Sequence, residues 1–181
     1  MTQRTFSCTG IVLKRINTGE TDRIVTLLTK EQGKMVAVAK GVRTLSSTKR
    51  ASLEPGNIVK AFFVRTKSLP LLTQTRLVSD CIDLPQTLQR LRQLSELLEI
   101  LEKLFVEEEL DLNTFRTVLN VRNLVISKQS SPKKVRESLV SLIVALGFQN
   151  PDDTKHTSIS EYVASLSEKP MRSYEFLKLQ H

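Results

Sequence analysis

The sequence predicts an α+β protein, with a small β-barrel or sandwich in its first half and a bundle of helices in its second. Short apolar segments rich in β-branched residues recur through residues 1–80, separated by Gly, Asn, Pro or Ser. After residue 83, leucines recur every three or four positions, as on one side of a helix. Charge divides the same way: residues 1–80 hold 14 Lys and Arg against 5 Asp and Glu, and residues 81–181 hold 13 against 14. We therefore expect two domains, 1–80 and 81–181.

Five strands are expected in the first domain. The segments are Gly10–Arg15, Ile24–Leu28, Met35–Ala39, Ile58–Val64 and Leu71–Val78. A tight turn over residues 31–34 joins the second to the third, and the polar, basic connection over residues 45–55 has room for a short helix. Phe62 and Phe63 are adjacent on the fourth strand, so one should face the core and the other solvent, where it could stack on a base.

Helices are expected throughout the second domain. The first should run over residues 84–105, with Pro85 near its start, where a missing N–H costs little. Ser131 is placed to cap a later helix that Gly147 stops, and Ser158 with Glu161 has the form of a capping box. The remaining predicted segments are Asn113–Ile126, Pro132–Leu146, a helix from Ser158 through Leu166, and a last turn or two over Ser173–Leu179.

Composition and motifs exclude several classes of protein. No apolar stretch reaches the roughly 20 residues of a membrane helix, and the first residues lack the apolar region of a signal peptide. Two distant cysteines, Cys8 and Cys81, predict no disulfide framework, so we expect a reduced, cytoplasmic protein. The common phosphate-loop, serine-elbow and zinc-protease motifs are absent, and the two histidines, His156 and His181, fall in a predicted loop and tail. We expect no enzyme, cofactor or metal.

The excess of positive charge in the first domain favours a polyanionic partner. Lys and Arg gather at strand ends and in the loop after the third strand, where they could line one track for a nucleic-acid backbone. Strand ends are commonly solvated and favour lysine in any case, so the cluster carries the prediction more than any single residue. The predicted nucleic-acid-binding residues are Lys14, Arg15, Arg23, Lys34, Lys40, Arg43, Lys49 and Arg50.

Several short motifs agree in order and spacing with one known family. They are Gly10–Lys14, Gly19-Glu20-Thr21-Asp22-Arg23, Gly33-Lys34, Ala39-Lys40-Gly41-Val42-Arg43, Leu53-Glu54-Pro55 and, more loosely, Leu146-Gly147-Phe148. In these the chain resembles the bacterial recombination mediators of the RecO family. The resemblance implies an amino-terminal five-stranded OB-fold barrel followed by an all-helical carboxy-terminal domain. It also implies binding of single- and double-stranded DNA, strand annealing, and help in loading RecA together with RecR and the tail of single-strand-binding protein.

The chain departs from that family in one respect. Many members carry a four-cysteine zinc site after the segment that matches Leu146–Phe148, whereas residues 149–157 here contain no cysteine. We therefore expect a short, zinc-free form that acts near the nucleoid. An acidic partner tail is expected to dock between helices of the second domain, at Lys128, Lys133, Lys134 and Arg136. The alternative is an OB-fold adaptor that binds an acidic protein or RNA.

Overall fold

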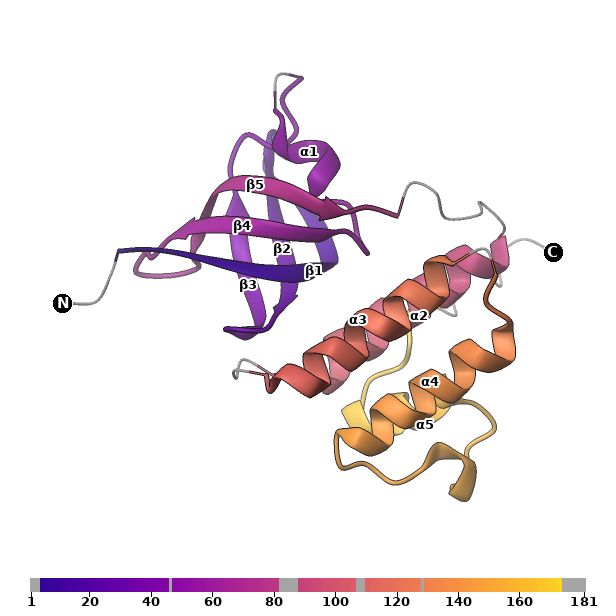
Figure 1. The fold of residues 1–181 in the computed structure, drawn as a ribbon. Coiled ribbons are helices and arrows are strands. Elements are labelled where there is room, and N and C mark those ends of the chain that lie inside the picture. Colours follow the sequence, from indigo (N-terminus) through magenta and orange to yellow (C-terminus); the bar gives the residue numbers. More distant parts are fainter. Residues whose placement is uncertain (1–3, 46, 82–87, 107–109, 128, 174–181) are drawn as a thin grey trace. The chain divides into compact units, whose positions relative to one another are not determined.

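A computed structural model describes residues 4–45, 47–81, 88–106, 110–127 and 129–173. They form strands and helices in the order shown in Figure 1, which confirms the predicted α+β class. The strands are Thr5–Thr18 (β1), Asp22–Thr29 (β2), Gly33–Ala39 (β3), Ile58–Val64 (β4) and Leu71–Ser79 (β5). The helices are Lys49–Ser52 (α1), Leu88–Leu104 (α2), Leu112–Ile126 (α3), Pro132–Ala145 (α4), Ile159–Ser167 (α5) and a 3₁₀ turn, Pro151–Asp153 (η1).

The strands close into a barrel in the order β1-β2-β3-β5-β4. β1 is long enough to pair with β4 over Thr5–Ile11 and with β2 over Gly10–Thr18. Its register with β2 shifts between Val12 and Lys14, just after the last residue that pairs with β4. β3 and β5 close the barrel through a short parallel pairing. This connectivity, with α1 between β3 and β4, is that of the OB fold, so the barrel and not the sandwich is the correct alternative.

Side chains alternate between the inside and the outside along each strand, and those that point inward fill the barrel. Phe63 is 1% exposed and lies in the core, whereas Phe62 is 37% exposed and lies on the outside, which confirms the predicted division between the two rings. Phe6 packs on Phe63 with ring centroids 5.0 Å apart. The core also contains Val12, Val25, Leu27, Met35, Ala37, Leu53, Val59, Ala61 and Leu72.

β5 is the least regular strand of the barrel. Only Leu71 and Leu72 pair with β3, and no described strand pairs with that edge of β5 beyond Leu72. Along its other edge the register with β4 shifts twice, which leaves Thr73 and Val78 as extra residues. α1 covers part of the open edge, where the Ser52 and Thr75 hydroxyls lie 2.6 Å apart.

The chain divides into two compact units, one of residues 1–81 with 105–110 and the other of residues 82–104 with 111–181. Within the first unit, the Lys34 N–H donates to the Val106 carbonyl and the Leu110 N–H donates to the Lys30 carbonyl, both at 2.9 Å. The segment after α2 is therefore bound to the turn between β2 and β3, a contact that the sequence did not predict. A domain boundary at residue 80 stays a prediction.

The helical unit follows its predicted signals closely. The Ser131 hydroxyl accepts the Lys134 N–H, and the Ser158 hydroxyl accepts the Glu161 N–H at 3.1 Å, so both predicted caps are confirmed. Gly147 has φ +86° and follows the last turn of α4, where the Phe148 N–H donates to the Ile143 carbonyl. The predicted helix start at Pro85 lies outside the described residues, as does the predicted last turn beyond Ser173.

The segment after α5 is fixed to α2. The Glu99 carboxylate accepts the N–H groups of Arg172 at 2.7 Å and Ser173 at 2.8 Å, and these bonds lower the pKa of Glu99 despite the opposing effect of burial. Lys103 donates to the Lys169 carbonyl one turn further along α2. Within the described ranges, no helix is both long and apolar enough to span a membrane.

Candidate nucleic-acid interface

The basic loop that follows β3 is held in place by an acidic residue of β2. The Gly41 N–H donates to Asp22 Oδ1 at 2.8 Å, and Gly41 has φ +62°, a conformation that favours glycine. That hydrogen bond is the main reason why the pKa of Asp22 is lowered, with further contributions from Thr21, Lys40 and Lys49. Asp22 therefore both fixes the loop and offsets part of its charge.

Arg43 completes the connection between this loop and the turn that precedes β2. Its backbone N–H donates to the Thr21 carbonyl at 2.9 Å, and its Nη1 donates to the Gly19 carbonyl at 3.1 Å. The two motifs 19–23 and 39–43, which are separate in sequence, therefore hold each other in the fold. The Arg43 side chain remains exposed.

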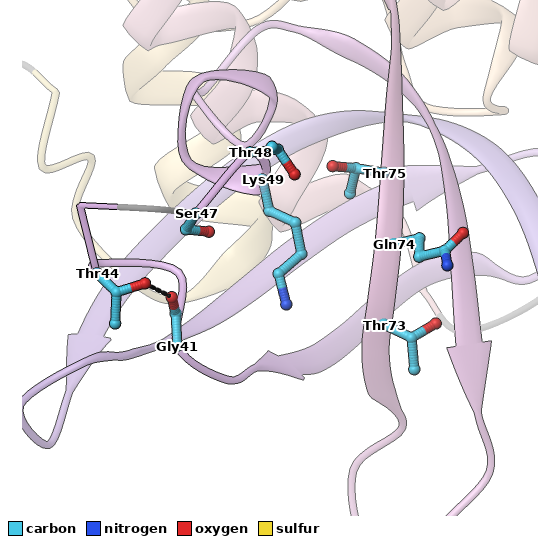
Figure 2. A pocket seen from close by; sticks show the side chains of 8 residues that line it. All are labelled: Gly41, Thr44, Ser47, Thr48, Lys49, Thr73, Gln74 and Thr75. Atoms are coloured by element: carbon cyan, nitrogen blue, oxygen red, sulfur yellow. Dashed lines mark hydrogen bonds between the residues drawn. The ribbon is translucent and has the colours of Figure 1, made fainter.

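A polar groove of about 520 Å³ lies between this loop and the open edge of β5. Figure 2 shows the Lys49 side chain extending into it from α1, with Thr73 to Thr75 on the opposite side. Lys49 Nζ donates to the Lys40 carbonyl at 3.0 Å, which holds the Lys49 side chain against the loop after β3. Its walls are hydroxyls and amides with few apolar atoms, an arrangement suited to a hydrated, charged chain. The lining residues are Gly41, Thr44, Ser47, Thr48, Lys49, Thr73, Gln74 and Thr75.

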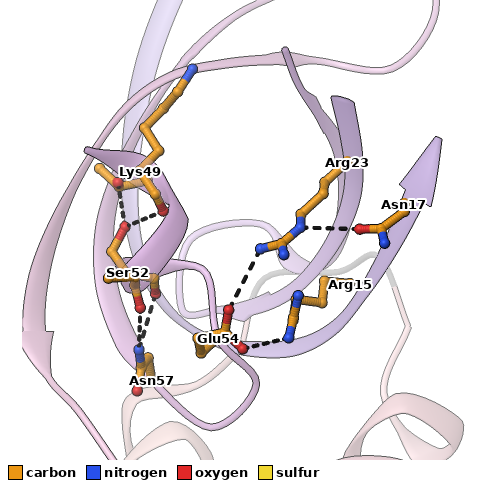
Figure 3. Close-up of polar contacts among 9 residues, drawn as sticks. Arg15, Asn17, Arg23, Lys49, Ser52, Glu54 and Asn57 are labelled. Atoms are coloured by element: carbon orange, nitrogen blue, oxygen red, sulfur yellow. Dashed lines mark hydrogen bonds and ion pairs between the residues drawn. The ribbon is translucent and has the colours of Figure 1, made fainter. Parts of the chain in front are cut away.

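Glu54 forms ion pairs with Arg15 and Arg23, which make up a second basic cluster (Figure 3). Its carboxylate lies 2.7 Å from Arg15 Nη2 and 3.6 Å from Arg23 Nη1. Arg23 also donates through Nε to Asn17 at 3.2 Å, and it is only 4% exposed. Burial, followed by the nearby charge of Arg15, lowers the pKa of Arg23. In this arrangement the Arg23 guanidinium is buried next to the Glu54 carboxylate.

The eight predicted nucleic-acid-binding residues therefore fall into three groups. Lys40, Arg43, Lys49 and Arg50 lie together on the loop and α1, and Arg15 and Arg23 are bound to Glu54. Lys34 begins β3 at its far end, about 20 Å from Lys40 at the usual rise per residue, and Lys14 pairs with Thr26 midway along β2. The structure therefore places Lys40 and Arg43 on the loop after β3 and Lys49 and Arg50 on the helix that follows, and does not join all eight into one track.

The polar residues around Phe62 were not among the predicted site residues. A second hollow, of about 440 Å³, shares Thr73 and Gln74 with the groove and reaches Phe62 and Phe6. Lys60 Nζ lies 5.8 Å from the centre of the Phe62 ring, and Arg65 Cζ lies 4.6 Å from that of Phe6. Alternation along β4 was the available signal, because it puts Lys60 on the same face as Phe62.

The predicted partner-binding residues lie at the start of α4. Arg136 forms an ion pair with Asp152, which raises the pKa of Arg136 and lowers that of Asp152. Lys133 lies 3.9 Å from Glu137, and Lys134 is exposed. Lys128 lies outside the described residues. Arg136 is therefore paired closely within the helical unit, whereas the contact of Lys133 with Glu137 is long and exposed.

The residues present do not fit the zinc site of the family that the chain resembles. Cys8 is buried in the barrel, Cys81 follows β5, and both belong to the first unit. Across the described ranges, no group of three or more His, Cys, Asp or Glu side chains is arranged to hold a metal ion. His156 lies against Tyr162 and Ser165.

Comparison with known proteins gives one consistent result. Residues 1–80 match the family model described as Recombination protein O N terminal. The chain is 31% identical over 148 residues to the DNA repair protein RecO of Bifidobacterium adolescentis, covering 78% of this chain and 58% of the relative. The RecO protein of Syntrophomonas wolfei is 29% identical over 139 residues, which are 77% of this chain and 56% of the relative. The RecO protein of a Synechococcus strain is 51% identical over 65 residues, which are 36% of this chain and 23% of the relative. The chain thus spans less than two thirds of the length of these curated relatives.

Proposed function

Because residues 1–80 of this chain match the model of the amino-terminal domain of the RecO family, we propose that the protein is a non-enzymatic DNA-binding mediator in DNA repair and recombination. The observation that carries the proposal is the loop of Lys40, Arg43, Lys49 and Arg50 beside a polar groove along β5, here named the β5 groove. Lys49 lines this polar groove, and its Nζ donates to the Lys40 carbonyl of the basic loop. A sugar-phosphate backbone matches that surface in charge and hydration.

The geometry of the loop supports binding of phosphates without reading of sequence. Asp22 and the Gly19 and Thr21 carbonyls fix the loop at Gly41 and Arg43, and the Lys40 carbonyl holds Lys49 Nζ, so part of the basic surface is ordered before DNA arrives. Preorganised charges bind with a smaller loss of conformational entropy than the same charges on a loose loop. Arg15 and Arg23 take a positioning role in this proposal, since Glu54 already binds both.

Annealing follows from the same surface. Two complementary strands repel each other through their phosphates, and a cationic surface that binds either strand lowers that repulsion where they meet. No general base, nucleophile or metal is needed for this step. In the same proposal the protein acts at the nucleoid and helps RecA load, together with RecR and single-strand-binding protein.

The tail of single-strand-binding protein is proposed to dock at the start of α4. Lys134 is exposed, and the ion pair of Lys133 with Glu137 is solvated, so both remain available to an acidic peptide. Changing Lys128, Lys133, Lys134 and Arg136 together to alanine should weaken binding of a tail peptide at least tenfold. Unchanged peptide binding would contradict this docking site and leave the DNA-binding proposal intact.

The test of the DNA-binding proposal is a salt series. Labelled poly-thymidine should bind the protein at low salt, and log affinity should fall linearly with log salt. Absence of binding by the folded protein at low salt would contradict the proposal. Tight, salt-resistant binding to one acidic protein, without DNA binding, would favour the adaptor alternative. RNA that binds more tightly than DNA of the same length would favour the adaptor's RNA form.

A further inference from the structure

We infer that Phe62 and the polar residues beside it form a base-stacking site, which makes the protein prefer unpaired bases over a bare sugar-phosphate backbone. The inference rests on the proposed function, because it assigns the bases of a strand whose phosphates lie along the basic loop. It goes beyond that function, because a surface that contacts only phosphates would bind any polyanion, with or without bases.

The outer face of β4 has the composition of such a site. Phe62 lies between Ser7 of β1 and Gln74 of β5, its direct partners in the two neighbouring strands. The ring is 37% exposed, although an aromatic side chain gains by burial, and its two neighbours are small or polar. A planar base on this ring would find hydroxyl and amide groups at its edges, which accept or donate hydrogen bonds without demanding one base.

Cations lie close enough to Phe62 to contact the phosphates of a nucleotide whose base stacks on the ring. Lys60 lies two residues from Phe62 on the same face, opposite Arg76 of β5. Lys60 Nζ is 5.8 Å from the centre of the ring, an exposed cation–π contact that exchanges readily for a phosphate. The hollow around Phe62 shares Thr73 and Gln74 with the β5 groove, so a strand can pass from the basic loop to the ring without leaving the surface.

The register shift at Thr73 explains how the two hollows are connected. Phe62 pairs with Gln74 and Phe63 with Leu72, which leaves Thr73 as an extra residue in β5. The Thr73 hydroxyl donates to the Phe62 carbonyl at 3.1 Å and so holds this bulge against β4. Bulges at the rim of a barrel redirect neighbouring side chains, and here the redirected segment lines both hollows.

The outer face of β2 and β3 lacks these features. Its central side chains are Ile24, Thr26, Val36 and Val38, all only half-buried, and neither strand contains an aromatic residue. An aliphatic face can cover a base but provides no ring to stack on. The structure therefore assigns the bases to the β4 face.

The decisive experiment compares two DNA strands of equal length and charge, oligo-thymidine and an abasic strand with no bases. Wild type should bind oligo-thymidine at least about fivefold more tightly, because stacking of one base on an aromatic ring supports a difference of that size. Phe62→Leu should remove most of this preference and leave affinity for the abasic strand unchanged. Ile16→Ala, which alters another exposed apolar residue of the barrel, should retain the preference.

The other possible results of this binding experiment separate the stacking site from the proposed DNA binding. Equal binding of both strands by wild type would overturn the stacking site and leave the proposed DNA binding intact, as would a preference that Phe62→Leu does not alter. Loss of the preference in Ile16→Ala would move the bases to the β1–β2–β3 face and overturn the assignment. Binding of neither strand would refute the proposed function itself, and the stacking site with it.

Tryptophan fluorescence tests the same stacking site without a comparison of affinities. The chain contains no tryptophan, so Phe62→Trp places a single reporter at the site. Oligo-thymidine should quench its fluorescence at saturation, and the abasic strand should quench it much less. Equal quenching by both strands, each bound to saturation, would overturn the stacking site.

Discussion

The Asp22 carboxylate accepts the backbone N–H of Gly41 at 2.8 Å and so ties the start of β2 to the loop after β3. Gly41 adopts φ +62° at this point, and the chain then turns back to place Arg43 against Thr21 and Gly19. Two motifs that look independent in the sequence are therefore one structural unit, whose surface carries the basic loop.

The Asp22 contact predicts a specific acid sensitivity. The pKa of Asp22 is lowered in the folded state, so its contribution to stability is complete above the unfolded value near 3.8 and is lost as pH falls through the folded value. Asp22→Asn should show a smaller loss of stability as the pH falls below about 4, measured by urea unfolding at each pH. Glu20→Gln, at an exposed position nearby, is the matched control, and an acid dependence of Asp22→Asn equal to that of wild type would contradict the prediction.

Glu54 should matter for stability because Arg23 is buried beside it. Glu54→Gln leaves the Arg23 guanidinium 4% exposed and without its counter-charge, and we expect a loss of about 1–3 kcal/mol in the free energy of unfolding. Arg23→Met should cost less in the Glu54→Gln background than in wild type, since the second change removes the unpaired charge. Additive losses in this double-mutant cycle would show that the pair is not coupled.

Gly10 should tolerate no side chain. A Cβ there would lie 2.5 Å from the Leu28 carbonyl oxygen and 2.7 Å from Thr29 Cγ2, so the paired strands would have to separate. Gly10→Ala should destabilise the protein by about 2–3 kcal/mol. Gly19→Ala meets open space but has φ +55°, and should cost about 1 kcal/mol. The two variants, compared by urea unfolding, would contradict this account if their order were reversed.

Cys8 should be unreactive in the folded protein. Burial, with a smaller effect of Glu31, raises the pKa of its thiol to about 12, so on the order of 10⁻⁴ of it is ionised at pH 8. In a Cys81→Ala variant, which leaves Cys8 as the one thiol, labelling at pH 8 should require unfolding and should accelerate in urea. Rapid labelling of the native variant would contradict the burial of Cys8.

Local signals made much of this fold predictable. Ser131, Ser158 and Gly147 act within one turn of chain, and the structure confirms all three. Alternation along β4 likewise separated Phe62 from Phe63. These features depend on residues close in sequence, where spacing alone fixes which side chains and backbone groups meet.

Contacts between distant segments were not predictable in the same way. Nothing in the spacing of Asp22 and Gly41, or of Arg23 and Glu54, indicates that they meet, because closure of the barrel brings them together. Charge was the one feature of the sequence that grouped Arg15 and Arg23 with the loop cations. Which cations face solvent depends on an acidic partner contributed by another part of the chain.

The most direct test of the central claim is the affinity for single-stranded DNA, measured by fluorescence anisotropy over a salt series. Lys40→Glu/Arg43→Glu/Lys49→Glu is compared with Lys133→Glu/Lys134→Glu/Lys155→Glu, since each change takes the net charge from +8 to +2 (8 − 6). We predict that the loop variant loses binding or keeps a salt slope smaller by about 2, at roughly 0.7 per contact, whereas the helical variant binds much as wild type does. Equal losses in the two variants would mean that net charge alone attracts DNA, and would contradict a binding site on the loop after β3.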